Sequence, residues 1–275
     1  MKTLLTTLLL ASLIQLTHAQ TGSNVIGARS TGMGGASVTL QELWSTFNNQ
    51  AGLAYVEDIE AGLAYESRFS LNELSLKSIA IAIPTNSGVF GFAATSFGFS
   101  DYAESKYGIS YGRLLAENIS FGGQINYQNI RLPGAYGNWS TVSGELGLQA
   151  KITKELSIGA HIVNPAKIKI AENPDERLAS IIKIGSVYQF SENVLAAVEV
   201  EKVINQDASL KTGIEYLFSE KIFFRGGLGT GPVKTNFGFG INTNNLKFDA
   251  AVWYHQILGF SPSLSLSYVF ESSNK

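Results

Sequence analysis

The chain has 275 residues, 15% of them charged, a formal net charge of −2 and no cysteine. The near-neutral balance gives no electrostatic case for nucleic-acid binding, and the lack of cysteine excludes disulfides as a source of stability. Charged residues are scarce against the usual quarter or so. With 28 Gly, 16 Phe and 11 Tyr, this composition suits a β-barrel that keeps its polar face inside.

The first nineteen residues have the pattern of a secretory signal peptide. Lys2 precedes an apolar stretch from Leu4 to Leu16, and Thr17 and Ala19 place small residues before a cleavage point at Gln20. The stretch is too short to span a bilayer as a helix. We therefore predict export and removal of residues 1–19. The alternative is a buried N-terminal helix.

Alternation with a period of two organises the rest of the chain. Within residues 118–131, Ile125 and Tyr127 share one parity, whereas Gln124 and Asn126 share the other. Successive side chains of a strand point to opposite faces, so one face is apolar and the other polar. The pattern predicts fourteen strands, at 58–67, 74–84, 87–100, 104–115, 118–131, 139–152, 155–163, 178–190, 193–202, 208–218, 221–230, 234–243, 245–255 and 261–270.

The links between these strands alternate in length. After each even strand the link is a tight turn such as Thr85–Gly88 or Asn242–Asn245, whereas most odd strands end in longer links such as 164–177. This rhythm is typical of a barrel in the outer membrane of a bacterial cell, with short turns in the periplasm. An even strand number then places both termini in the periplasm. A soluble β-sandwich has no reason to keep this rhythm.

Charge placement agrees with a transmembrane antiparallel β-barrel over residues 58–270, followed by a periplasmic tail at 271–275. Charged side chains take the parity opposite the apolar stripe, because a charge facing lipid near the midplane costs a few kcal/mol. The predicted lumen-facing residues are Glu145, His161, Lys183, Glu199, Glu201, Lys211, Glu215, Arg225, Lys247 and Asp249. The apolar parity would contact outer-membrane lipid.

Residues 20–57 do not follow the strand pattern. We predict that they fold into the lumen as an N-terminal luminal hatch, with a short helix within Val38–Phe47. Apolar side chains there are costly to leave in water, and the glycines allow tight turns against a wall. The predicted hatch residues are Arg29, Gly32, Gly34, Gly35, Leu40, Trp44 and Phe47. The alternative is a disordered periplasmic lead.

This segment resembles a known family. Gly32-Met33-Gly34-Gly35-Ala36, followed by Asn49-Gln50-Ala51-Gly52-Leu53-Ala54, is similar to the N-terminal region of FadL/TodX-like outer-membrane proteins, and most of all to the PorV/PorQ-like branch of Bacteroidota. The resemblance implies a barrel of fourteen strands with a hatch. Gln50 stands where that family has proline, so we expect a less constrained turn there.

Motifs of catalysis and metal binding are weak. Gly108-Ile109-Ser110-Tyr111-Gly112 matches the nucleophile-elbow pattern, but it lies in an alternating strand rather than before a helix. His161 and His255 are single histidines without placed partners, which do not make a zinc site. We predict that the protein is not an enzyme and uses no cofactor or metal.

Two functions fit these observations. The first is a porin-like, FadL-like transport protein whose hatch closes the lumen, with a small hydrophobic compound as the ligand that the resemblance implies. The second is a PorV-like accessory subunit that transports nothing and binds subunits of a type 9 secretion translocon. A continuous apolar path through lumen and hatch would favour transport.

Overall fold

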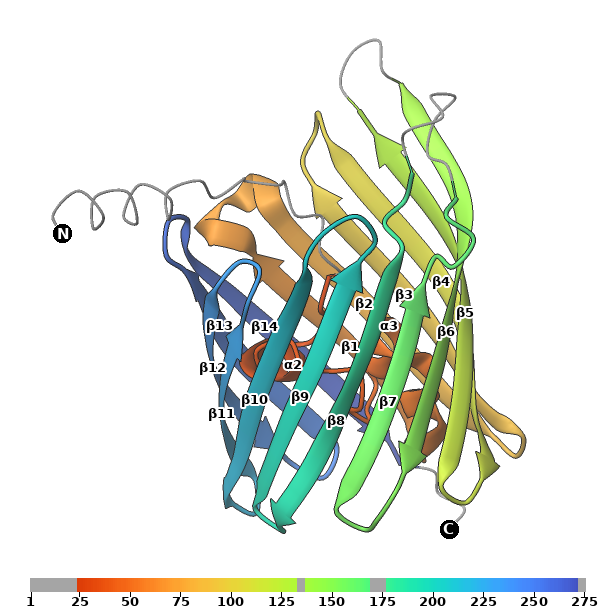
Figure 1. The fold of residues 1–275 in the computed structure, drawn as a ribbon, viewed down its shortest axis with the longest axis vertical. Helices are drawn as coiled ribbons and strands as arrows, with labels where there is room; N and C mark the ends of the chain where they lie inside the picture. The colour runs from red at the N-terminus through yellow and green to blue at the C-terminus, as the bar shows by residue number, and fades with distance from the viewer. Residues whose placement is uncertain (1–23, 133–136, 169–176, 272–275) are drawn as a thin grey trace, which may run out of the picture.

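A computed structural model describes residues 24–132, 137–168 and 177–271. Fourteen antiparallel strands form a closed barrel in which each strand pairs with its neighbours in sequence and β1 (Ile59–Ser67) closes against β14 (Gly259–Phe270) (Figure 1). The predicted fold class is thereby confirmed. The predicted signal peptide and the predicted tail beyond Glu271 lie outside the described residues.

Each strand lies within three residues of its predicted bounds. The other strands are β2 (Ser75–Thr85), β3 (Gly88–Gly98), β4 (Ala103–Ala116), β5 (Ile119–Arg131), β6 (Asn138–Lys151), β7 (Leu156–Val163), β8 (Ile181–Ser191), β9 (Val194–Val203), β10 (Ala208–Ser219), β11 (Ile222–Gly229), β12 (Lys234–Asn242) and β13 (Leu246–His255). Period-two alternation with turn residues at fixed intervals was sufficient to place them.

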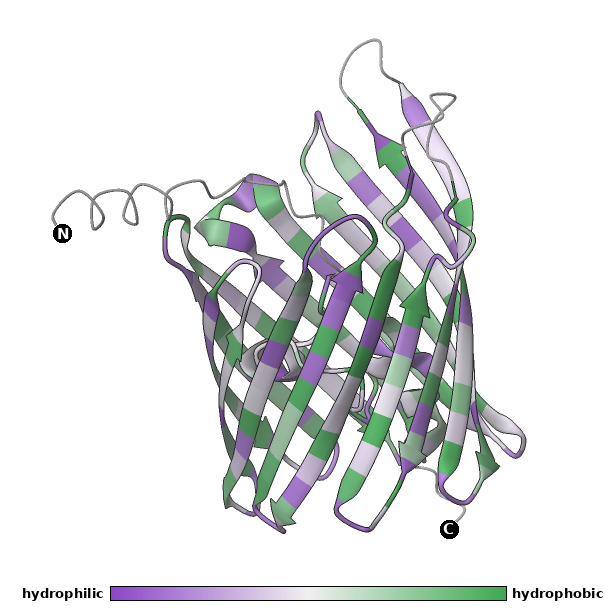
Figure 2. Cartoon of the chain, viewed as in Figure 1, coloured by the Kyte–Doolittle hydropathy of each residue, from purple (hydrophilic) through white to green (hydrophobic). Residues whose placement is uncertain are grey.

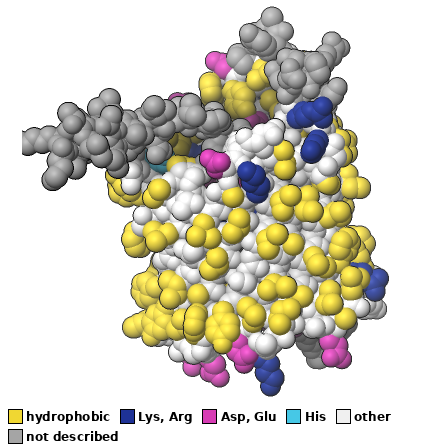
Figure 3. Space-filling view, viewed as in Figure 1, with side chains coloured by type: hydrophobic (Ala, Val, Ile, Leu, Met, Phe, Trp, Pro, Cys, Tyr) yellow, Lys and Arg dark blue, Asp and Glu magenta, His cyan; other side chains and the backbone are white. Residues whose placement is uncertain are grey.

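The two faces of the wall differ in polarity, as Figure 2 shows by the alternating colours along each strand. Ile125 is 68% exposed and Phe237 is 62% exposed, whereas Asn126 and Asn236 are buried at 0% and 4%. The space-filling view shows hydrophobic side chains spread over the outer face (Figure 3). Because a surface this apolar is unfavourable in water, it is the lipid-facing side of a transmembrane barrel.

The two ends of the barrel also differ. The links after even strands, such as 86–87 and 192–193, all lie at the end that carries Phe270, which we name the turn end. The links after odd strands start at the opposite end, the loop end, and include 68–74 and 204–207. Figure 1 shows the loop end at the top.

The helices are short. Inside the barrel are α2 (Ala28–Gly32), α3 (Ser45–Asn48) and the 3-10 helix η1 (Gln50–Tyr55); the β1–β2 link contains η2 (Arg68–Ser70) and η3 (Asn72–Leu74). The expected helix within Val38–Phe47 is wrong for most of its length, since only its last turn is helical. No helix in the described ranges is long and apolar enough to cross a membrane.

We predict that Phe237→Arg destabilises the barrel by roughly 2–4 kcal/mol, because it places a charge on the lipid face. Phe237→Leu, the matched control, keeps that face apolar and should stay close to the parent. Equilibrium unfolding of the protein in lipid vesicles measures both variants. Equal stability of the two variants would show that Phe237 does not contact lipid.

Candidate functional site

Residues 24–57, which we name the luminal segment, run through the interior of the barrel from one end to the other (Figure 1). At the loop end, Arg68 Nη2 donates a hydrogen bond of 2.5 Å to Asn24 Oδ1. At the turn end, η1 leads into β1. The described chain therefore begins at the end opposite Phe270, and the predicted periplasmic position of both termini stays a prediction, because residues 1–23 are outside the described ranges.

Glycines of the wall make room for the backbone of the luminal segment. A Cβ added to Gly112 would lie 2.5 Å from Gln50 O, and one added to Gly159 would lie 2.7 Å from Val38 O. Seven strands have such a glycine against the segment backbone, namely Gly112, Gly122, Gly147, Gly159, Gly213, Gly227 and Gly238, and three more have one against its side chains, namely Gly62, Gly91 and Gly185. Close backbone approach is a reason for glycine inside a strand, so the wall is shaped to this segment.

Side chains bond the non-helical backbone before α3. Glu199 Oε2 accepts the N–H groups of Ser37 and Val38, each at 2.8 Å. Val38 O accepts from Asn49 Nδ2 at 2.6 Å and from Gln149 Nε2 at 3.0 Å. Buried backbone groups need such partners, and these bonds replace the helical ones that the sequence led us to expect.

A chain of ion pairs joins the luminal segment to β10, β11 and β13. Arg29 Nη2 lies 2.6 Å from Glu215 Oε1, and Arg29 Nη1 lies 3.1 Å from Glu42 Oε2. Arg225 bonds Glu215 and, at 2.7 Å, Asp249. Burial raises the pKa of the Glu42 carboxyl above its usual range, although Arg29 opposes this shift. Arg29 is the link between the segment and the wall.

A second polar cluster surrounds Glu145. Gln50 Nε2 donates to Glu145 Oε2 at 3.0 Å, Asn126 Nδ2 donates to Glu145 Oε1 at 2.9 Å, and Lys106 pairs with the same carboxylate. His161 Nε2 lies 3.1 Å from both Gln50 Oε1 and Glu145 Oε2. Both neighbours are acceptors, so Nε2 carries the proton and donates.

The residues predicted to face the lumen fall into four groups. Glu145 and His161 share the cluster above; Glu215, Arg225 and Asp249 share the Arg29 chain; Glu199, Glu201, Lys183 and Lys211 form a third group; and Lys247 pairs with Glu60 at 3.0 Å. All are buried except Lys211 and Lys247, which are half-buried. In the segment, Gly32, Gly35, Leu40, Trp44 and Phe47 are buried, and Arg29 and Gly34 are half-buried.

Sequence reasoning missed three members of these groups. Gln50 was noted only as a departure from a family pattern, yet it is fully buried and binds two wall residues. Glu60 and Lys106 complete ion pairs. The luminal parity of Glu60 and Lys106 was readable from the sequence, but the position of Gln50 depends on contacts distant in the chain.

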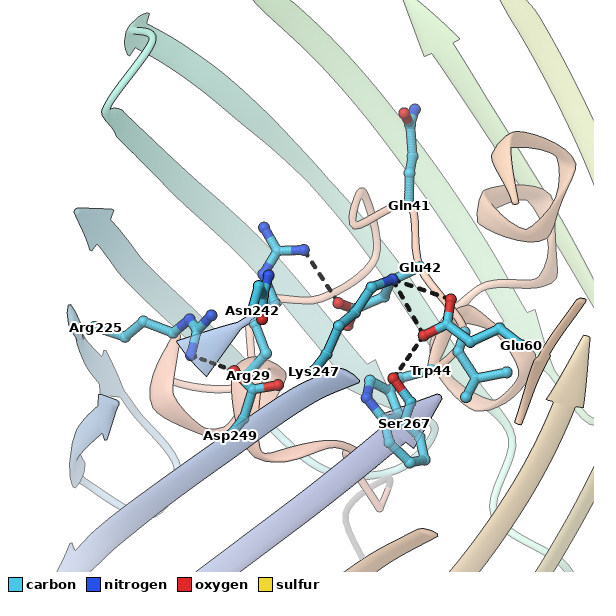
Figure 4. A pocket seen from close by; sticks show the side chains of 11 residues that line it. Arg29, Gln41, Glu42, Trp44, Glu60, Arg225, Asn242, Lys247, Asp249 and Ser267 are labelled. Atoms are coloured by element: carbon cyan, nitrogen blue, oxygen red, sulfur yellow. Dashed lines mark hydrogen bonds and ion pairs between the residues drawn. The ribbon is translucent and has the colours of Figure 1, made fainter. Parts of the chain in front are cut away.

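A polar cavity of about 90 Å³ lies beside the Arg29 chain (Figure 4). Its lining includes Arg29, Glu42, Glu60, Arg225 and Lys247. These charges are already paired with one another, and the space suits a few water molecules. An apolar ligand would not be stable there.

Apolar contacts gather next to this cavity, where the luminal segment meets β1, β2 and β3. We name this cluster the apolar seam; it contains Ile26, Leu43, Trp44, Phe47, Leu53, Leu76, Ala80, Ala82, Val89 and Ala93, with Val56, Ala64 and Phe97 packed against it. Phe97 pairs with Leu76 near the loop end, and Val89 pairs with Pro84 near the turn end. The seam therefore reaches along β2 and β3 from near the loop end to near the turn end, and it is filled by side chains.

The sequence motifs that we judged too weak to indicate catalysis or metal binding lie in the barrel wall. Residues 108–112 of the elbow pattern lie within β4, and Ser110 is buried there without a histidine partner among the bonds of the described chain. His255 lies at the loop end of β13. Within the described ranges, no group of three or more His, Asp or Glu is placed to hold a metal ion.

No family model and no curated protein matches the sequence. Similar solved structures include the Ralstonia pickettii toluene transporter TbuX, with a TM-score of 0.69 and 13% identity over 89% of this chain and 98% of that one. The Pseudomonas putida toluene transporter TodX has a TM-score of 0.65 and 12% identity over 90% and 97% of the two chains. A Pseudomonas aeruginosa FadL homologue has a TM-score of 0.67 and 11% identity over 90% and 99%. At these identities the likeness establishes the fold.

We predict that Gly227→Ala displaces the luminal segment, because the new Cβ would overlap the backbone nitrogen of Gly34. The expected loss of stability is about 1–3 kcal/mol. Gly226→Ala is the matched control, since its Cβ meets only Ile214 Cγ2 at 4.0 Å. Trypsin cleavage after Arg29 reports displacement. Equal resistance of both variants to cleavage would contradict the close approach.

Proposed function

We propose that this protein is an outer-membrane channel, FadL-like in function, that carries small hydrophobic compounds across or into the outer membrane. The observation that carries the proposal is the apolar seam, the larger of two apolar clusters in the described lumen, which reaches along β2 and β3 from near one end of the barrel to near the other. A hydrophobic compound would partition into such a seam and avoid the ion pairs of the lumen. The similar solved structures named above, two of them toluene transporters, support the same class of cargo.

In this proposal the luminal segment acts as a hatch. Its apolar side chains, among them Leu43, Trp44 and Phe47, fill the seam, so passage requires them to move away from β1–β3. The Arg29 chain and the bonds to Glu199 hold the other side of the segment to β9–β11. The segment can therefore tilt away from the seam while it stays attached to the opposite wall.

The outer membrane is the proposed location, with the short turns and the end of β14 in the periplasm; the predicted periplasmic N-terminus is not part of this proposal, because Asn24 lies at the loop end. The apolar outer face, the exported chain that the N-terminal pattern predicts, and the difference between the turn end and the loop end support this location. PorV/PorQ-like proteins of Bacteroidota remain the relatives that the sequence motifs at 32–36 and 49–54 suggest.

A second candidate is a non-transporting accessory subunit of a type 9 secretion translocon. The observation that favours it is the tight fit between wall glycines and segment backbone, which seals the lumen. A sealed barrel of this kind would use its loop end to bind a protein partner.

Uptake of radiolabelled toluene by intact Gram-negative cells tests the first candidate. We predict that the parent protein raises uptake several-fold over cells with an empty vector, and that Ala82→Leu, which fills the seam, removes most of the increase. Ala197→Leu is the matched control, because Ala197 is an equally buried alanine that packs with Met33 and Ala36 outside the seam. Each change overpacks a buried site by about 1–3 kcal/mol.

Equal loss in both variants would mean that overpacking in general, and not the seam, limits uptake. If the parent itself gave no increase, transport of this compound class would be rejected, and the accessory role would be tested by purification of the protein with its translocon partners.

A further inference from the structure

Lys234 is a luminal cation without a carboxylate partner among the described residues. It lies at the loop end of β12 and is half-buried. Elsewhere on the outer half of the lumen, Lys106, Lys183 and Lys211 each have a carboxylate within 4 Å. The contact that Lys234 makes is with a ring: its Nζ lies 4.2 Å from the centroid of Trp253. A desolvated ammonium without a counter-ion attracts an anion.

The nearest acidic group on the β1–β2 side is already occupied. Glu66 Oε1 accepts from Arg68 Nε at 3.1 Å, and Arg68 also stacks on Phe97, with 4.9 Å between the guanidinium carbon and the ring centroid. Glu66 is therefore paired with Arg68 and not with Lys234.

Two aromatic rings, those of Trp253 and Phe69, lie beside Lys234, and we name them the aromatic shelf. The ring of Phe69 packs edge-on against Trp253, with centroids 5.3 Å apart, and against His255 at 6.1 Å. Phe69 and Ser70 have φ values of 54° and 57°, a conformation that bulky residues rarely adopt. Strained backbone of this kind clusters at functional sites.

Two hydrogen bonds hold the strained turn in place. The Phe69 N–H donates to Ser261 Oγ at 2.7 Å, and Ser70 Oγ donates to Phe260 O at 3.0 Å. The β1–β2 link is therefore fastened to β14, and this contact presents the Phe69 ring to Trp253 at the mouth of the lumen.

His255 supplies a further donor. It is paired directly with Lys234 across β12 and β13, so the two side chains share one face of the wall. Its Nδ1 accepts the N–H groups of Ile257 and Leu258, each at 3.2 Å. The ring proton is thus on Nε2, which has no hydrogen-bond partner in the described chain and can donate.

We propose that Lys234, His255, Trp253 and Phe69 form a capture site for aromatic carboxylates at the loop end. The carboxylate would bind between Lys234 Nζ and His255 Nε2–H, and the ring of the ligand would pack against Phe69, which the buried ring of Trp253 holds in position. Phe69, Lys234 and His255 are half-buried, so a solute at the mouth can reach them. This inference deepens the proposed function and rests on it for the fate of the captured ligand, but binding itself can be measured separately.

Equilibrium dialysis of the full-length mature protein in detergent tests the site with three probes. Benzoate carries ring and charge, toluene carries the ring alone, and acetate carries the charge alone. We expect benzoate to bind at least about tenfold more tightly than either of the others, since a charge-assisted hydrogen bond contributes about that factor. Comparable binding of benzoate and acetate, or of benzoate and toluene, would overturn the proposal without any variant.

Variants then assign the roles. Lys234→Met should weaken benzoate binding about tenfold and leave toluene unchanged, Lys234→Arg should retain it, and Trp253→Leu should weaken both ring-bearing probes. Lys202→Met is the matched control, because Lys202 is exposed at the same end and bonds only Gln206 O. Benzoate binding that survives Lys234→Met would reject the site.

The outcome is separable from that of the proposed function. Benzoate binding without toluene uptake by cells would keep the capture site and reject hydrocarbon transport. Uptake of toluene without preferential binding of benzoate would keep transport and reject the capture site.

Discussion

The structure depends on one constraint, which is the burial of the backbone of the luminal segment. This backbone must find hydrogen-bond partners inside the barrel. The backbone groups of the strands are already bonded to those of neighbouring strands. Turns and short helices of the segment satisfy part of its backbone. Wall side chains supply further partners, as Glu199 does for Ser37 and Val38 and Asn236 does for Thr31 O at 2.7 Å. These bonds require close approach, and wall glycines such as Gly213 and Gly227 provide it. Segment and wall are complementary because neither can satisfy its polar groups alone.

The same constraint divides the lumen into two sides with different chemistry. Where the segment meets β4–β13, the ion pairs and amide contacts gather, as around Glu145 and Arg29, beside one small apolar cluster at Ala197. Where it meets β1–β3, the contacts are apolar and the wall residues are small, such as Ala80 and Ala82. When the segment separates from β1–β3 at the apolar seam, no buried charge loses its partner. Movement on this side therefore has a lower electrostatic cost than movement away from the ion pairs.

The barrel could be predicted from the sequence, because alternation and turn residues are local signals. Fourteen strands and the inward parity of residues such as Lys183 and Glu215 follow from them. The interior could not be predicted to the same extent. Gln50 and Asn49 acquire their roles from Glu145 and Gly147, about a hundred positions away in the chain. The expected helix before Phe47 failed for a related reason, since wall side chains bond that backbone instead.

The central claim is that the luminal segment is a movable hatch. The lack of native cysteine allows a direct measurement, because Ala28 N and Ser265 Oγ lie 3.1 Å apart. Cysteines at these two positions would attach the segment to β14, next to the seam. We predict that toluene uptake by cells falls to the empty-vector level when the pair is oxidised and recovers on reduction. Uptake that stays at the parent rate in the oxidised protein would contradict the account.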